Sequence, residues 1–142
     1  MTTSFPLRPA VGLALLRITT GAIFLMHGYQ KLFVMTIPGV TRFFTKAAIP
    51  MPGVTASLIT LLEFVGGIAL VLGLFSHVFA LLFVFDMLGA IMFVHLKNGF
   101  FAPTGFEFPL GLAVSSLTIA FAGAGAYALD AMIGSRRRDH AL

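Results

Sequence analysis

Two polar motifs occur twice in this chain, in the same order each time. The pattern GAIxxxHxxQ begins at residue 21 and GAIxxxHxxN begins at residue 89, so His27 corresponds to His95. The pattern EFxxGxA begins at residues 63 and 107, so Glu63 corresponds to Glu107. The His and Glu matches are the informative ones, because ionisable residues are scarce here and costly inside a bilayer. The alternating order predicts a duplicated helical hairpin.

The first group of candidate site residues gathers at one predicted helix boundary. It comprises His27, Gln30, Lys31, His95, Asn98 and Glu107, with Lys97 beside them. Such side chains can hydrogen-bond the carbonyls of a quinone, and two histidines with a glutamate can also bind a metal or haem. No HxxxH or ExxH spacing supports a metal site. A third interpretation is that these residues only anchor helix ends at the membrane interface.

The second group is predicted to lie near the middle of three helices. Arg17, Glu63 and Asp86 have comparable depths when residues are counted from the helix ends. We expect Arg17 to pair with Asp86, or with Glu63 if helix rotation prefers it, and this pair can be purely structural. One arginine against two acids leaves one carboxyl for proton exchange, and Glu63 is the candidate. Asp86 and His95 lie about 180° apart on an ideal helix, so both can face one narrow cavity only if that helix is kinked.

Composition shows which kind of element must position these residues. The chain has 142 residues, of which 58% are hydrophobic and 10% charged, and its mean hydropathy is +1.02. An ordinary soluble domain has about 25% charged residues. The apolar runs are continuous for about twenty residues, as in membrane-spanning helices, whereas barrel strands alternate apolar and polar residues. These features predict an all-α, integral membrane four-helix bundle in contact with the lipid bilayer.

The absence of cysteine limits the chemistry available to the chain itself. It excludes disulfides, CxxC redox pairs, thiolate metal sites and iron–sulfur clusters carried by this chain. Electron transfer would therefore need a bound cofactor, a quinone or a partner protein. The net charge is +4, and three of the nine basic residues form the run RRR that begins at residue 136. Beside a membrane span, such a run indicates contact with anionic lipid rather than with nucleic acid.

Four spans are predicted within one domain, residues 1–142. They cover residues 9–33, 54–75, 78–96 and 107–126, and residues 34–52 form a loop with a short interfacial helix at 40–48. An even number of spans places both termini on one side, and the terminal arginines favour the cytoplasmic side.

Motifs along nearly the whole chain resemble those of the DoxX family. They are LRxxxG at residue 16, HGxQKLF at 27, ExxGG at 63, GLF at 73, HxxNGFF at 95, ExPL at 107, GxG at 123 and LD at 129. The resemblance implies a four-span protein of the bacterial inner membrane. Members of the family are associated with thiosulfate:quinone oxidoreductase subunits and with oxidative-stress complexes. Nothing in these residues supports thiosulfate chemistry itself.

The residues and the resemblance together favour a quinone-linked oxidoreductase subunit that acts with a redox partner or as a homo-oligomer. The first group would hold the quinone in a cavity on the side away from the termini, walled by nearby phenylalanines such as Phe24 and Phe93. Glu63, Asp86 and Arg17 would handle protons. Two alternatives stay open: a non-catalytic anchor or assembly factor of a redox or oxidative-stress complex, and a protein that binds metal or haem at His27 and His95. A small transporter is disfavoured, because no span is predicted to break in its middle.

Overall fold

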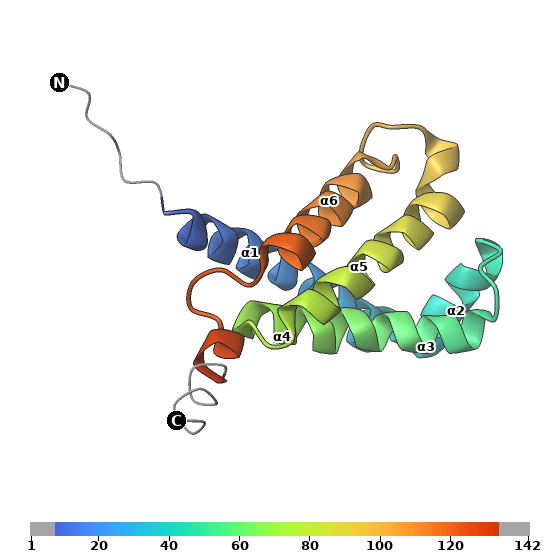
Figure 1. Cartoon of the computed structure of the whole chain (residues 1–142). Helices are drawn as coiled ribbons and strands as arrows, with labels where there is room; N and C mark the ends of the chain where they lie inside the picture. The colour runs from blue at the N-terminus through green and yellow to red at the C-terminus, as the bar shows by residue number, and fades with distance from the viewer. Residues whose placement is uncertain (1–7, 134–142) are drawn as a thin grey trace.

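The structure is a computed structural model that describes residues 8–133, and this part of the chain contains helices and no strands (Figure 1). The first helical stretch contains three elements, α1 (Pro9–Tyr29), the π-helical turn η1 (Gln30–Met35) and α2 (Thr36–Lys46), and the chain bends sharply at Thr36, where φ is +60°. The second joins α3 (Pro52–Leu61), the π-helical turn η2 (Leu62–Gly66) and α4 (Gly67–Leu72).

The second half of the chain also forms two long helical stretches, and in the described residues it has no counterpart of α2. Helix α5 (Ser76–Ala90) continues into the π-helical turn η3 (Ile91–His95) and the 3-10 turn η4 (Leu96–Asn98). Helix α6 (Glu107–Ala122) follows. The described chain then passes through Gly123 and Gly125, both at positive φ, into a short helical segment at residues 129–133. The arginine run that begins at residue 136 lies outside the described residues.

The helices have the length and surface of a membrane protein. Three of them, Pro9–Lys46, Pro52–Leu72 and Ser76–Asn98, are long and apolar enough to cross a bilayer, and α6 is a shorter apolar helix. Large apolar side chains remain exposed on each of these helices, among them Leu15, Leu58, Phe85 and Phe121. Such a surface suits lipid rather than water. The predicted all-α membrane bundle is confirmed.

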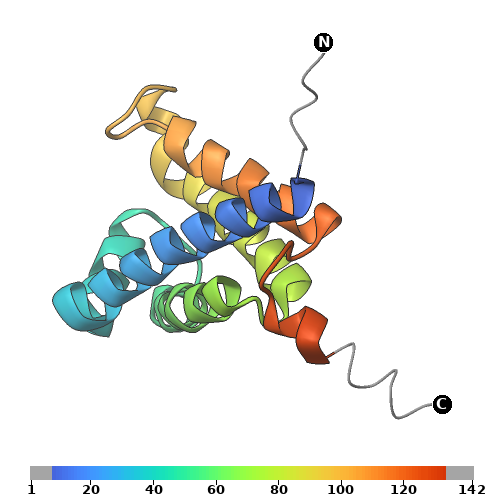
Figure 2. The same cartoon turned by 90° about the vertical axis from the view of Figure 1, so that its left-hand side faces the viewer.

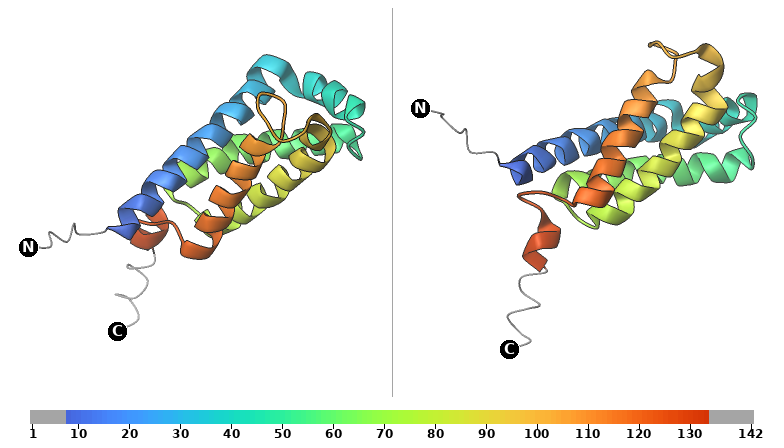
Figure 3. Two further views of the ribbon diagram at one scale, coloured as in Figure 1. Left: turned by 90° about the horizontal axis from the view of Figure 1, so that it is seen from above. Right: turned by 45° about the horizontal axis from the view of Figure 1, so that its top comes forward.

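The helices form two antiparallel pairs that cross one another (Figures 1 and 3). Helix α1 packs along α4 and η2, and α5 packs along α6. Between the pairs, α1 contacts α6, whereas α5 makes only minor contact with α4. The stacked rings of Phe24 and Phe83, with centroids 3.7 Å apart, join α1 to α5 in the buried core. That the two pairs superpose as a true duplication remains a prediction.

Glycine sets the distance between α1 and the second helix. A Cβ atom on Gly28 would overlap the backbone of Phe64, and one on Gly67 would overlap the backbone of Leu25. The two helix backbones are therefore in direct contact. Close approach of this kind is how helices associate in lipid, where burial from water provides no driving force between them.

The two ends of the bundle differ. The first and last described residues lie together at one end (Figure 2), where the amide of Ala126 donates to the carbonyl of Ala10 at 2.8 Å. At the other end α2 folds back on α3 through Val40, Phe44 and Ala56. The two helix pairs diverge towards this second end (Figure 1).

Candidate functional site

A cavity of about 640 Å³ lies between the two helix pairs. That volume is in the range of small-molecule sites, roughly 300–1,000 Å³. Most of the lining is apolar, with phenylalanines from α1, α2, α5, η3 and α6. Five ionisable residues also line it, namely His27, Lys31, Glu63, Asp86 and His95. An apolar cavity with a few convergent polar groups is the usual form of a ligand site.

Three π-helical turns border the cavity and carry three of its ionisable side chains. Lys31 belongs to η1, Glu63 to η2 and His95 to η3. A π-helical turn bonds i to i+5, so it holds more residues than an α-helical turn and changes the direction in which the following side chains point. This explains how Asp86 and His95 line the same cavity although an ideal helix would set them on opposite faces. Short π-helical segments frequently occur at functional sites.

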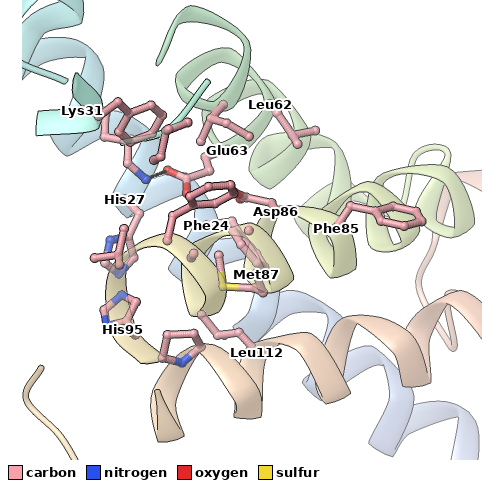
Figure 4. A pocket seen from close by; sticks show the side chains of 18 of the residues that line it. Phe24, His27, Lys31, Leu62, Glu63, Phe85, Asp86, Met87, His95 and Leu112 are labelled. Carbon is pink, nitrogen blue, oxygen red and sulfur yellow. Dashed lines mark hydrogen bonds and ion pairs between the residues drawn. The ribbon is translucent and has the colours of Figure 1, made fainter. Parts of the chain in front are cut away.

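One lysine and two acids lie near one another in the cavity lining (Figure 4). Lys31 forms an ion pair with Glu63, whose side chain is only 3% exposed. The carboxyl of Asp86 lies beside this ion pair and lines the same cavity (Figure 4). Asp86 is also buried, and no donor in the described residues reaches its Oδ2 atom. The cluster therefore has one cation for two carboxyl groups and one carboxyl oxygen without a donor.

The two histidines differ in what they can offer a ligand. The Nδ1 atom of His95 lies 2.9 Å from the carbonyl oxygen of Thr104. A carbonyl only accepts, so Nδ1 carries the hydrogen and the neutral ring has an acceptor at Nε2. In residues 8–133 the His27 ring makes no hydrogen bond and rests near the ring of Phe108, with centroids 6.4 Å apart. His27 is therefore free to donate.

Three residues of the predicted quinone group lie outside the cavity lining, and two of them order the chain locally instead. Gln30 is exposed at the start of η1. Asn98 donates through Nδ2 to the carbonyls of Val94 and Thr104, and so orders the loop before α6.

Glu107 is the third of these residues, and its surroundings differ from those of Glu63. Its carboxylate accepts from the backbone amide of Ala102 at 2.6 Å. Glu63 and Glu107 occupy matching motifs in the sequence, but only Glu63 lines the cavity. The motif therefore identifies a pair of acids without showing which of them lines the cavity.

The predicted pairing of Arg17 with Asp86 or Glu63 is wrong. Arg17 is fully buried at the terminal end, where its Nη2 atom donates to the carbonyls of Ala126 and Tyr127, each at 3.3 Å. The predicted pairing compared residue depths along the helices, which is valid only if α1 and α5 run side by side. They belong to crossing pairs, and α1 packs chiefly on α4, η2 and α6. Arg17 consequently lies away from the acids of the cavity.

Asp130 is a structurally important residue for which the sequence motifs predicted no role beyond the family resemblance. Its carboxylate accepts from the amides of Phe75 and Ser76 at 2.9 and 3.0 Å, and its own amide donates to Gly73. These bonds cap the start of α5 with a residue from the far end of the chain. An N-cap is normally recognised because it directly precedes its helix, so no local signal could reveal this one.

The described residues offer no set of ligands for the metal or haem considered as an alternative. His27 and His95 line the same cavity, but residues 8–133 contain no group of three or more His, Asp or Glu side chains arranged to hold a metal ion. Glu63, which could have supplied a further ligand, is already engaged by Lys31.

Comparison with known proteins places these residues in context. The sequence model of the DoxX family matches residues 12–96, which include every ionisable residue of the cavity. The chain is 34% identical to a protein of Bacillus subtilis named putative oxidoreductase CatD, covering 87% of each chain. It is 30% identical to the inner membrane protein YphA of Escherichia coli, covering 87% of this chain and 90% of the relative. No solved structure matches significantly.

Proposed function

This chain belongs to the DoxX family of membrane proteins, and we propose that it is a subunit of a quinone-linked oxidoreductase that binds the quinone head group in the cavity. The observation that carries the proposal is the Lys31–Glu63–Asp86 cluster inside an otherwise apolar cavity. The name of the Bacillus subtilis relative, a putative oxidoreductase, also supports redox chemistry.

The charges of the cluster suit proton exchange. Two carboxylates and one ammonium group would leave a net negative charge in a low-dielectric space, which is costly. One proton shared between Glu63 and Asp86 makes the cluster neutral and supplies the unpaired Oδ2 atom of Asp86 with a partner. Lys31 is 20% exposed, more than Glu63, so it connects the buried acids with the outer part of the cavity. Protons can pass between the two acids and the outer part of the cavity by way of Lys31.

The remaining polar groups can orient a ring that has two carbonyls. A quinone takes up two electrons and two protons when it is reduced. His27 and Lys31 can donate hydrogen bonds to a carbonyl, and Nε2 of His95 can accept one from a hydroxyl. Glu63 and Asp86 hold and deliver protons within reach of the same space. Apolar walls for the ring come from the cavity phenylalanines, which include Phe24, Phe93 and Phe108.

The electrons must come from elsewhere. The chain has no cysteine and no motif for a soluble redox cofactor, so we propose a redox protein that docks at the membrane surface as its partner. The relatives named as membrane or inner membrane proteins support a place in the bacterial inner membrane. We propose cytoplasmic termini on the basis of the terminal arginines.

Binding of a benzoquinone to the purified full chain in lipid nanodiscs tests the proposal. We expect the wild type to bind, and Lys31→Met and Glu63→Gln to bind roughly tenfold more weakly or worse, because each removes a polar contact or a charge partner. Lys46→Met, at an exposed lysine on α2 outside the lining, is the matched control and should bind as the wild type does.

Absence of binding by the wild type would overturn the quinone proposal. Equal binding by all four proteins would show that the quinone sits elsewhere. The alternative role, a non-catalytic anchor or assembly factor, would be favoured if the Lys31 and Glu63 variants co-purified with the same proteins as the wild type and no quinone was bound.

A further inference from the structure

We propose that the cavity opens sideways into the hydrocarbon between α3 and α5, and that the aliphatic chain of a lipid-soluble quinone lies in this opening. The proposal rests on the proposed function and names its substrate class: a quinone carrying a polyprenyl chain rather than a water-soluble ring. The sequence motifs contain no sign of such an opening.

The lining residues fall into a polar part and an apolar part. His27, Lys31 and Glu63 lie together at one side of the cavity in Figure 4, whereas Phe85 points away from them beyond Asp86. The apolar part is formed on α5 by Leu82, Phe85 and Gly89, and on the facing helix by Ile59 and Leu62. An amphiphile would place its head at the polar side and its chain in the apolar part.

The apolar part reaches the surface that faces lipid. Leu82 is 42% exposed and Phe85 is 63% exposed although both line the cavity. Both residues lie in the middle of the Ser76–Asn98 helix, at the depth of the hydrocarbon rather than of the headgroups. Helix α5 packs on α6, and α3 packs on α2 and η2, so neither helix closes the space in front of the other.

Gly89 keeps this opening wide. A Cβ atom placed on Gly89 would meet nothing within 4 Å, although the residue lies in α5 and lines the cavity. Glycine inside a helix costs roughly 0.5–1 kcal/mol relative to alanine. No steric clash requires glycine at this position. No positive φ requires it either, because Gly89 has helical backbone angles. The space beside Gly89 is therefore open, and because Gly89 lines the cavity this space is available to a ligand.

The chain offers a matched pair of glycines for the test. A Cβ atom on Gly111, in α6, would also meet nothing within 4 Å, and this glycine lies outside the cavity lining. Gly89→Phe should therefore fill the opening, and Gly111→Phe should add the same side chain to a lipid-facing surface. The Cβ atom of neither substitution meets another atom within 4 Å, so we expect both proteins to fold, and circular dichroism of each checks this.

The measurement compares two ligands with one ring, a benzoquinone with a decyl chain and the same ring without the chain, on the full-length protein in nanodiscs. Apolar contact is worth about 0.8 kcal/mol for each buried methylene. We therefore expect Gly89→Phe to weaken binding of the chain-bearing quinone roughly tenfold or more, and to leave binding of the bare ring within about threefold of wild type. Gly111→Phe should match the wild type with both ligands. Equal effects of Gly89→Phe on both ligands, or no effect on either, would overturn the proposal.

A second measurement keeps the inference testable if the wild type binds no quinone and the proposed function fails. Because the chain has no cysteine, a single Ile59→Cys carries one bimane label into the cavity. Brominated acyl chains in the nanodisc should quench this label, and Gly89→Phe in the same protein should reduce the quenching. A Phe121→Cys label, at a residue 83% exposed, should be quenched equally with and without the change at Gly89. Absence of quenching at residue 59 would show that no lateral opening exists.

Discussion

The two ends of this bundle use their charged side chains in opposite ways. At the terminal end, Arg17 and Asp130 bond backbone groups of distant segments and hold the last described residues onto α1 and onto the start of α5. At the cavity end, Lys31 pairs with Glu63, and Asp86 lies beside them at the edge of open space. Charges directed at backbone fix a fold, whereas charges directed at one another around a cavity can exchange partners with a ligand. Substitutions at the two ends of the bundle should therefore differ in their effect on stability.

Glycine should be least replaceable at the terminal end. Gly73 has φ +74°, and a Cβ there would collide with the Arg17 guanidinium and with Ala128. We expect Gly73→Ala to lower the free energy of unfolding by more than about 3 kcal/mol, through overpacking and strain together. Gly89→Ala at the cavity end should instead raise it by about 0.5–1 kcal/mol. Unfolding by sodium dodecyl sulfate in mixed micelles measures the free energy of unfolding of both variants. If both variants lost similar stability, the two ends of the bundle would not differ in this way.

Arg17 should matter more for stability than an exposed arginine. Arg17→Leu leaves the carbonyls of Ala126 and Tyr127 without their donor and removes the cation near Asp130. An unsatisfied buried group costs about 1–3 kcal/mol, so we expect a loss of about 3 kcal/mol. The control is Arg42→Leu at an exposed position on α2. Equal melting temperatures of the two variants would show that the terminal end is not held by Arg17.

The stability lost when Lys31 is replaced should be restored by a second substitution. Lys31→Met removes the cation that pairs with the buried acids, and we expect it to cost about 2 kcal/mol, because protonation of the acids relieves part of the penalty. The double variant Lys31→Met with Glu63→Gln should recover most of that loss, since the charge left behind on Glu63 is removed as well. Differential scanning fluorimetry compares the melting temperatures of the single and double variants. A double variant less stable than the single one would contradict the proposed charge balance.

Asp130 should show the smallest of these effects. Asp130→Asn keeps one oxygen that can accept from the start of α5 but loses the second acceptor and the charge. Loss of a helix cap typically costs about 1 kcal/mol. Hydrogen exchange should then quicken at the amides of Phe75 and Ser76 while the amides of α6 keep their protection. Unchanged exchange at both amides would mean that water replaces the cap at no cost.

The sequence alone determined the class of the protein. Continuous apolar runs with few charges require helices in lipid, because every backbone group there must be satisfied within its own segment. The two motif pairs also identified His27, Glu63 and His95 before their surroundings were known, since an ionisable residue is costly in such a chain. These properties depend on local composition and spacing, so they could be read from the order of residues.

Which charged side chains meet depends on how the helices pack. The crossing of the two helix pairs separates Arg17 from Asp86 and brings Lys31 to Glu63, a pairing across 32 positions of the chain. The π-helical turn at Ile91–His95 brings His95 to the same cavity as Asp86. Asp130 reaches the start of α5 from 54 residues away. Each of these contacts depends on the angle and phase between helices, which arise from packing of whole surfaces and leave no local pattern in the sequence.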